Sequence, residues 1–209
     1  TGRGELAEAR ADENATADYA RTKGLGEAAV FTAAPDAVVF RPSVIFGPDD
    51  DFFNKFAAMA RLSPFLPLVG GGHTRFQPVF GGDVGEAVAK AVGNETTPGT
   101  IYELGGPEVY TFKELMEFVL ATIARRRLLL PVPFWAAKFM GQFLKYLPVP
   151  PLTPDQVELL KQDNVVSAAA QGEGRTLQGL GIEARSVETI VPSYLWRYRK
   201  TGQFRRSLA

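Results

Sequence analysis

Short apolar runs alternate along this chain with segments of helix-favouring residues, and this alternation constrains the fold more than any other feature. Apolar runs of the buried-strand type are found at 37–40, 76–80 and 100–104. Helix-type segments are found at 19–34, 52–62, 83–92 and from 111 onward. Asp83 is expected to be an N-cap, and Thr111 and Glu114 have the spacing of a capping box. The pattern predicts an α/β fold with parallel strands.

Composition excludes several kinds of chemistry. The 209 residues include 23 basic and 23 acidic side chains, so there is no basic surplus with which to bind nucleic acid. Cysteine is absent, which excludes disulfides, thiolate nucleophiles and cysteine-ligated metals. His73 is the only histidine, so neither a histidine-rich metal site nor a Ser–His–Asp triad is expected. No apolar run reaches the ~18 residues of a membrane span, and the chain is predicted to be cytoplasmic and without a transmembrane helix.

Tyr19 and Lys23 stand four residues apart in the first predicted helix, so both project from one face of it. An ammonium group beside a phenol favours the phenolate and lowers the phenol pKa, which lets tyrosine exchange a proton with a carbonyl or an alcohol. The spacing therefore suits hydride chemistry with a nicotinamide cofactor, whose ribose the lysine can also bind. The alternative is a solvated lysine beside a half-buried tyrosine.

The residues around this pair resemble the extended short-chain dehydrogenases/reductases, the NAD-dependent epimerase/dehydratase group. The helix motif Tyr19-Ala-Arg-Thr-Lys23 is followed, after a strand, by Arg41-Pro-Ser-Val-Ile-Phe-Gly-Pro48, which in that family forms a loop over the nicotinamide. Further matching blocks follow in the family's order at 76–80, 82–87, 102–108 and 111–115. The resemblance implies a Rossmann-type parallel sheet, with this chain as its C-terminal portion and a smaller substrate-side lobe interleaved.

The resemblance also implies roles for individual residues. Tyr19 would be the acid/base, and Lys23 would activate it and bind the cofactor ribose. Further cofactor contacts are implied at Arg41, Pro42, Ser43 and Val44, and substrate-side positions at Phe46, His73 and Gln77. The alternative for Arg41 is an ion pair with a buried carboxylate, and the alternative for His73 is ordinary hydrogen bonding in a loop.

Three further segments resemble one branch of that superfamily, the NAD(P)H-binding accessory subunit of respiratory complex I and its bacterial relatives. These segments are 70–78, the proline-rich 131–154 and 192–198. The resemblance implies NADP or NAD as cofactor, with NADPH favoured. It also implies docking on complex I, or on the inner face of the cell membrane, through 131–151 and 192–206. Residues 134–147 are apolar at helical spacing, which predicts either packing on the core or an interfacial helix.

Two parts of the family pattern have no counterpart in this sequence. The family opens with a strand, a GxxGxxG loop and a helix, whereas Gly24 and Gly26 lie inside the predicted tyrosine helix. The serine or threonine that partners the tyrosine is also missing, because Thr16 is too close to Tyr19. We therefore expect an incomplete chain. Its expected parts are a partial Rossmann domain at 1–98, with a substrate-side insertion at 52–78, and a C-terminal docking lobe at 99–209.

Two runs of like charge are expected to lie at helix ends. Asp49–Asp51 is interpreted as a helix start, where negative charge is favourable. Arg125–Arg127 is interpreted as a helix C-terminal cap, with anionic lipid as the alternative partner.

The sequence leaves three functions open. The first is an NAD(P)H-binding, SDR-like protein of the complex I accessory type with a docking or assembly role. The second is an active NAD(P)-dependent oxidoreductase or epimerase that uses the Tyr19–Lys23 pair. The third is an interaction module without a nucleotide.

Overall fold

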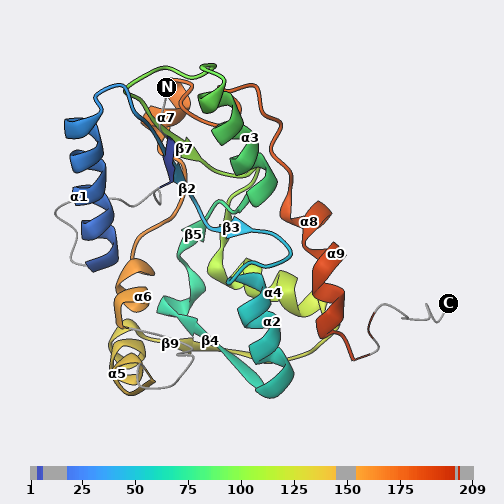
Figure 1. The fold of residues 1–209 in the computed structure, drawn as a ribbon. Coiled ribbons are helices and arrows are strands. Elements are labelled where there is room, and N and C mark those ends of the chain that lie inside the picture. Colours follow the sequence, from blue (N-terminus) through green and yellow to red (C-terminus); the bar gives the residue numbers. More distant parts are fainter. Residues whose placement is uncertain (1–3, 7–17, 145–153, 201, 203–209) are drawn as a thin grey trace.

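A parallel sheet forms the upper part of the molecule in Figure 1. The computed structural model describes residues 4–6, 18–144, 154–200 and 202. Strands β1 (Gly4–Leu6), β2 (Val38–Pro42) and β7 (Ile101–Leu104) pair in the order β1-β2-β7, and both pairings are parallel. The α/β class with parallel strands, predicted from the alternating pattern, is confirmed.

Both faces of β2 are covered by helices, which explains why its sequence is an unbroken apolar run. Val39 is fully buried and packs with Phe31 of α1 (Asp18–Ala33). Its neighbour Phe40 points to the opposite face, where it packs with Val84 of α3 (Gly81–Val92) and with Leu177. Helices α1 and α3 accordingly lie on opposite sides of the sheet in Figure 1.

A second lobe lies below the sheet in Figure 1 and has the larger core. Strands β4 (Phe65–Val69) and β9 (Leu128–Val132) pair in parallel, and α2 (Phe53–Leu62) and α4 (Phe112–Thr122) pack beside them. The core between these elements is built from Phe46, Phe53, Leu66, Leu115 and Met116, all fully buried.

Short elements connect and cover the two parts. The remaining strands are β3 (Ile45–Phe46), β5 (Arg75–Phe76), β6 (Val79–Phe80) and β8 (Tyr110–Thr111). The remaining helices are α5 (Phe134–Leu144), α6 (Pro154–Leu159), α7 (Ala168–Gly172), α8 (Val187–Ile190), α9 (Pro192–Leu195) and the 3-10 turns η1 (Gly70–Gly72) and η2 (Trp196–Tyr198). Helices α8 and α9 run from the sheet toward the second lobe (Figure 1).

Several expectations about elements differ from the structure. The predicted strand at 76–80 is two short strands in different sheets, because β5 pairs with β8 and β6 pairs with β3. Strand β9 was not predicted, since its partner β4 lies about 60 residues earlier in the chain and only folding brings the two together. Strand β7 lies beyond the domain boundary expected after residue 98, yet it pairs with β2.

Two capping roles are also corrected. Asp83 is not an N-cap: α3 begins at Gly81, and the buried Asp83 carboxylate accepts a hydrogen bond from the Arg185 backbone N–H at 2.8 Å. Arg125–Arg127 do not cap their own helix, which ends at Thr122. Instead, Arg127 Nε donates to the Ala60 carbonyl of α2 at 2.7 Å.

Helix α5 packs on the core, as one interpretation of its apolar sequence predicted, and the interfacial helix stays a prediction. Ala137 on one face is buried with Val69 and Val157. On another face Trp135 is 76% exposed and Phe139 is 64% exposed. None of the described helices combines the length and the apolar content that a membrane crossing needs.

The capping box at the start of α4, predicted from sequence, is confirmed and gives a first test. The Thr111 hydroxyl accepts from the Glu114 N–H at 3.2 Å, and the Glu114 carboxylate accepts from the Thr111 N–H at 2.7 Å. Replacing Thr111 with alanine is expected to lower the free energy of unfolding by about 1 kcal/mol, because one helix-terminal N–H loses its partner. Urea denaturation measures this change.

The matched control is Thr32→Ala in α1, because the Thr32 hydroxyl only donates back to the Ala28 carbonyl within an exposed part of the helix. That substitution should leave stability within about 0.5 kcal/mol. Equal losses in the two variants would contradict the capping role.

Candidate functional site

The carboxyl ends of the parallel strands meet at one edge of the sheet. The registers align Leu6 with Phe40, and Pro42 with Leu104, so β1, β2 and β7 end close together. In open α/β sheets, ligands bind in the crevice outside the carboxyl ends of the strands. Pro42 and Ser43, two of the predicted cofactor contacts, lie at this edge.

An ion pair holds α1 beside the carboxyl end of β2. Arg41 Nε lies 3.0 and 3.2 Å from the two carboxylate oxygens of Glu27, and the same guanidinium donates a third bond through Nη2. Glu27 is only 5% exposed, so Arg41 has the buried carboxylate partner that the sequence analysis offered as the alternative. Since a bidentate Arg–carboxylate pair fixes geometry as well as energy, it sets the position of α1 against the strand.

Tyr19 and Lys23 precede Glu27 by two turns and one turn of α1. Side chains four residues apart share a helix face, so the Lys23 position lies on the face that Glu27 turns toward β2. Lys23 is partly buried. Tyr19 belongs to the same helix, and its side chain lies outside the described part of the structure. The backbone therefore places the predicted pair on the helix that is tied to the carboxyl end of β2.

Ser43 and Gln77 lie together in a hydrogen-bonded network at the strand ends. The buried Ser43 hydroxyl donates to the Asn164 carbonyl at 2.7 Å and accepts from the Gln77 N–H at 3.3 Å. The Gln77 side chain donates to the Gly106 carbonyl at 2.8 Å and accepts from the Val166 N–H at 3.0 Å. The polar groups of both side chains are thus engaged with the protein itself.

Asn164 was not among the residues picked from sequence, although the structure places it at the centre of this network. It is 5% exposed, and its side-chain oxygen Oδ1 has no hydrogen-bond partner among the described residues. A buried amide oxygen without a partner is costly and can accept a bond from a ligand. The only sequence signal is a polar residue directly before the apolar pair Val165-Val166.

The loop after Ser43 is anchored to the end of the described chain. Tyr194 of α9 donates to Asp50 Oδ2 at 2.6 Å, and Arg197 donates to the Pro48 carbonyl at 2.9 Å. Burial and then the Asp50 carboxylate raise the pKa of Tyr194 above its ordinary value. The other carboxylate oxygen of Asp50 accepts from the Phe53 N–H at the start of α2, as expected for a helix start.

Three predicted residues lie away from the strand ends or inside the core. Val44 accepts from the Val79 N–H at 2.9 Å, which starts the β3–β6 pairing. Phe46 is fully buried and packs against Phe53 and Phe80. His73 is exposed and follows η1, which contacts β4, β9 and α4 of the second lobe. The structure therefore does not bring His73 to the edge where Ser43 and Gln77 lie.

Gln77 also lines a polar cleft of about 540 Å³. Gly105 and Gly106 line it from the end of β7, and Gln171, Gln178 and Glu183 line it from the C-terminal segment. Among the described residues, no group of three or more histidine, cysteine, aspartate or glutamate side chains could hold a metal ion. The cleft therefore offers amide and carboxylate groups to a small polar ligand.

Comparisons with known structures show which fold this chain shares. UDP-glucose 4-epimerase of Thermotoga maritima superposes with a TM-score of 0.64 and 15% identity, over 95% of this chain and 63% of its own. DesIV of Streptomyces venezuelae, a dTDP-glucose 4,6-dehydratase solved with NAD and TYD bound, gives 0.60 and 16%, over 96% and 60%. The fold is therefore that of the extended short-chain dehydrogenases/reductases, as the motifs predicted.

Sequence relatives narrow this class. The chain is 33% identical over 192 residues to the mitochondrial NADH dehydrogenase (ubiquinone) 1 alpha subcomplex subunit 9 of Arabidopsis thaliana, covering 87% of this chain and 47% of the relative. It is 28% identical over 203 residues to the Dictyostelium discoideum subunit of the same name, covering 96% and 55%. No protein-family model matches.

The chain is a homologue of this complex I subunit, and the branch predicted from its motifs is thereby confirmed. It spans about half the length of the curated relatives it matches. Those relatives are eukaryotic proteins, and their names place them in mitochondria, so a bacterial origin and a cytoplasmic location stay predictions.

Proposed function

We propose that this chain is part of an SDR-like subunit that binds NAD(P)H and has a docking or assembly role on respiratory complex I. The observation that carries the proposal is its similarity to complex I subunits over 86–96% of its length in four different organisms. Docking through 131–151 and 192–206 is part of the proposal, and it is supported by the exposed Trp135 and Phe139 on α5. Residues 145–153, 201 and 203–209 lie outside the described structure.

The site at the carboxyl ends of β1, β2 and β7 suits the nicotinamide half of a dinucleotide. Lys23 lies on the helix that Glu27 and Arg41 hold against β2, and it would bind the ribose. The backbone at Pro42 and Ser43 would lie beside the nicotinamide, and the Asn164 Oδ1 atom is a buried acceptor without a partner among the described residues. When bound, the nicotinamide can give or accept a hydride. We propose NADPH as the preferred form.

Binding without turnover is favoured over catalysis by the network at the strand ends. Ser43 and Gln77 direct their polar atoms to protein partners and not toward a substrate. The alternative, an active oxidoreductase or epimerase, is supported by the position of Tyr19 and Lys23 on the same helix. In that case Tyr19→Phe in the full-length protein would abolish turnover and leave nucleotide binding nearly intact.

The test is to isolate the tagged full-length protein gently from its own cells. We expect it to migrate with complex I on a native gel and to release NADPH when it is denatured in alkali. Migration apart from complex I would overturn the docking role. A protein that contains no nucleotide, and whose melting temperature is unchanged by NADPH and NADH, would favour the interaction module without a cofactor.

Lys23→Met provides a prediction about the cofactor site. Loss of a charge-assisted hydrogen bond to the ribose is expected to weaken NADPH binding by about tenfold, because such a bond contributes roughly 1.5 kcal/mol or more. Isothermal titration of the full-length protein measures the change. The control is Lys90→Met, which removes the same charge from α3, where Lys90 pairs with the exposed Glu95 at 3.0 Å. Equal affinities in both variants would rule out a ribose contact by Lys23.

A further inference from the structure

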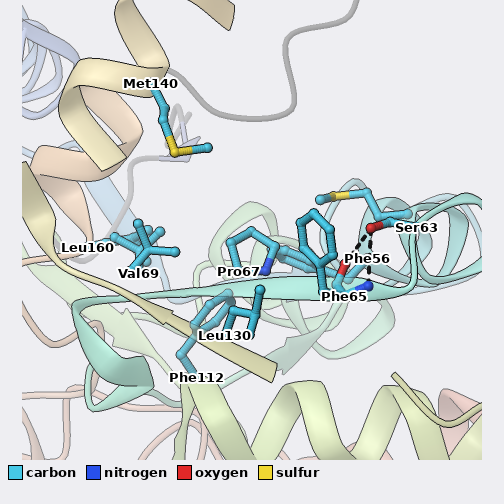
Figure 2. Close-up of a pocket in the computed structure, with 11 residues that line it drawn as sticks. Phe56, Ser63, Phe65, Pro67, Val69, Phe112, Leu130, Met140 and Leu160 are labelled. Atoms are coloured by element: carbon cyan, nitrogen blue, oxygen red, sulfur yellow. Dashed lines mark hydrogen bonds between the residues drawn. The ribbon is translucent and has the colours of Figure 1, made fainter. Parts of the chain in front are cut away.

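An apolar cleft of about 220 Å³ lies in the second lobe, away from the strand edge described above. Figure 2 shows the side chains that line it, which come from α2, β4, α4, β9, α5 and the end of α6. The lining residues are Phe56, Met59, Ser63, Phe65, Pro67, Val69, Phe112, Leu130, Val132, Met140 and Leu160. All except Ser63 are apolar, and the Ser63 hydroxyl is occupied by donating to the Phe65 carbonyl at 2.7 Å.

The cleft is elongated because it follows two paired strands. Phe65, Pro67 and Val69 alternate along β4 and therefore share one face. The register pairs Pro67 with Leu130 and Val69 with Val132, so β9 adds its side chains to the same face. In Figure 2 the lining runs along the strand from Ser63 and Phe65 to Val69 and Leu160, with Met140 on the α5 side.

Part of this lining is open to water. Phe65 is 47% exposed, Leu130 41% and Met140 45%. Leu62 and Leu128, at the Ser63 end, are more exposed still. Contiguous exposed apolar side chains around a concave surface are costly in water and mark a binding site for an apolar group. A peptide would bring backbone N–H and C=O groups, for which this lining offers no partners, whereas an alkyl chain needs none.

Two chain segments next to the Ser63 end of the cleft carry four arginines, of which Arg125 donates through Nε to the Tyr198 carbonyl at 3.1 Å. Arg61 lies in the last turn of α2, and Arg125–Arg127 lead into β9. Arg127 Nε donates to the Ala60 carbonyl at 2.7 Å, and the Leu128 N–H donates to the Pro64 carbonyl at 3.1 Å, so the two segments lie side by side. Within the described residues, none of the four takes part in an ion pair.

The arginines are close enough to affect one another. The pKa of Arg125 is lowered by burial and then by the positive charges of Arg127 and Arg61. Guanidinium groups that repel one another and lack carboxylate partners are stabilised by a bound anion, and they bind phosphate well because their planar N–H groups match its oxygens.

We propose that this cleft takes one acyl chain of an anionic lipid and that the cluster of Arg61 and Arg125–Arg127 binds the phosphate of its head group. The apolar lining accommodates the chain, and the arginines lie at one end of it, as an amphiphile requires. The cleft is separate from the proposed nucleotide site at the carboxyl ends of the parallel strands, so lipid binding does not depend on the proposed cofactor.

The experiment titrates full-length protein with decyl phosphate below its micelle concentration, followed by calorimetry. Neutral decyl glucoside supplies the same chain without the charge, and inorganic phosphate supplies the charge without the chain. We expect decyl phosphate to bind at least about tenfold more tightly than either. Binding of inorganic phosphate as tight as that of decyl phosphate would overturn the acyl part of the proposal, and the absence of any binding would overturn all of it.

Variants locate the two halves of the site. Met140→Trp places a larger side chain over the cleft and should weaken decyl phosphate and decyl glucoside alike. Arg61→Gln should weaken decyl phosphate about tenfold and leave decyl glucoside unchanged. If Met140→Trp does not fold, Leu130→Glu is used in its place. This substitution, at a half-exposed position, introduces a charge into the apolar lining.

Matched controls lie on α3, which is far from β4 and β9 in Figure 1. Val92→Trp enlarges another exposed apolar side chain, and Lys90→Gln removes the positive charge of the partly buried Lys90. Both controls should bind decyl phosphate as the unmodified protein does. Unchanged binding in folded Met140→Trp or Leu130→Glu protein, or in Arg61→Gln protein, would place the ligand elsewhere and overturn the proposal.

Discussion

Replacing Arg41 with alanine is expected to lower the free energy of unfolding by about 3 kcal/mol, because it leaves the Glu27 carboxylate buried without its charged partner. Glu27 is 5% exposed and bonds to Arg41 through both carboxylate oxygens. The substitution also frees α1 from the end of β2, so we expect nucleotide affinity to fall with it. Urea denaturation and NADPH titration of the full-length protein measure the two effects.

Two further variants test whether the stability lost in Arg41→Ala comes from leaving the Glu27 charge buried. The double variant Glu27→Met/Arg41→Met removes both charges and keeps much of the volume, so it should recover most of the lost stability. Lys90→Ala breaks the exposed Lys90–Glu95 pair and should cost only ~0.2–1 kcal/mol. If Arg41→Ala cost no more than Lys90→Ala, the ion pair would not be what holds α1 in place.

Replacing Gly106 with alanine is expected to lower the free energy of unfolding by about 3 kcal/mol. It should also disturb the site at the carboxyl ends of the parallel strands. A Cβ at Gly106 would lie 2.0 Å from the Pro78 carbonyl oxygen, a backbone atom that cannot move without displacing β6. Overpacking of this kind typically costs ~1–3 kcal/mol. The Gly106 carbonyl also accepts from Gln77, so its displacement would break the network around Ser43. Thermal unfolding measures the loss.

Gly85→Ala is the matched control for this substitution. Gly85 lies in α3, and a Cβ there would meet no atom within 4 Å. Alanine is the better helix former, so this variant should gain up to about 1 kcal/mol. The same substitution is therefore expected to act in opposite directions at two glycines. A neutral Gly106→Ala would show that Pro78 and β6 shift aside without cost.

Local sequence signals predicted the elements that depend on neighbours in the chain. The capping box of Thr111 and Glu114 needs only a spacing of three residues, and it was found as predicted. The apolar run before Arg41 predicted a strand with both faces covered, and β2 has this environment. The Tyr19–Lys23 spacing, read with the motifs that follow it, predicted the fold class that the structural comparisons show.

Partners distant in sequence could not be found in this way. A buried carboxylate partner was one of two expectations for Arg41, but nothing in the sequence identified Glu27, 14 residues before it. Asn164 was missed because its role depends on Ser43, 121 residues away. His73 was expected at the substrate side by resemblance, and the chain places it directly after η1, which contacts β4, β9 and α4 of the second lobe.

By itself, the sequence determined the α/β class, the helix that carries Tyr19 and Lys23, the strand that ends at Pro42, and the relationship to complex I subunits. These properties depend on residue spacing within single elements or on motif order, which the chain carries without folding. Tertiary structure alone decided that Glu27 holds α1 against β2, that Asn164 lies beside Ser43, and that β9 pairs with β4 to form the apolar cleft. The physical reason is that each of these contacts joins separate elements, so its existence depends on how the elements pack and not on the pattern within either one.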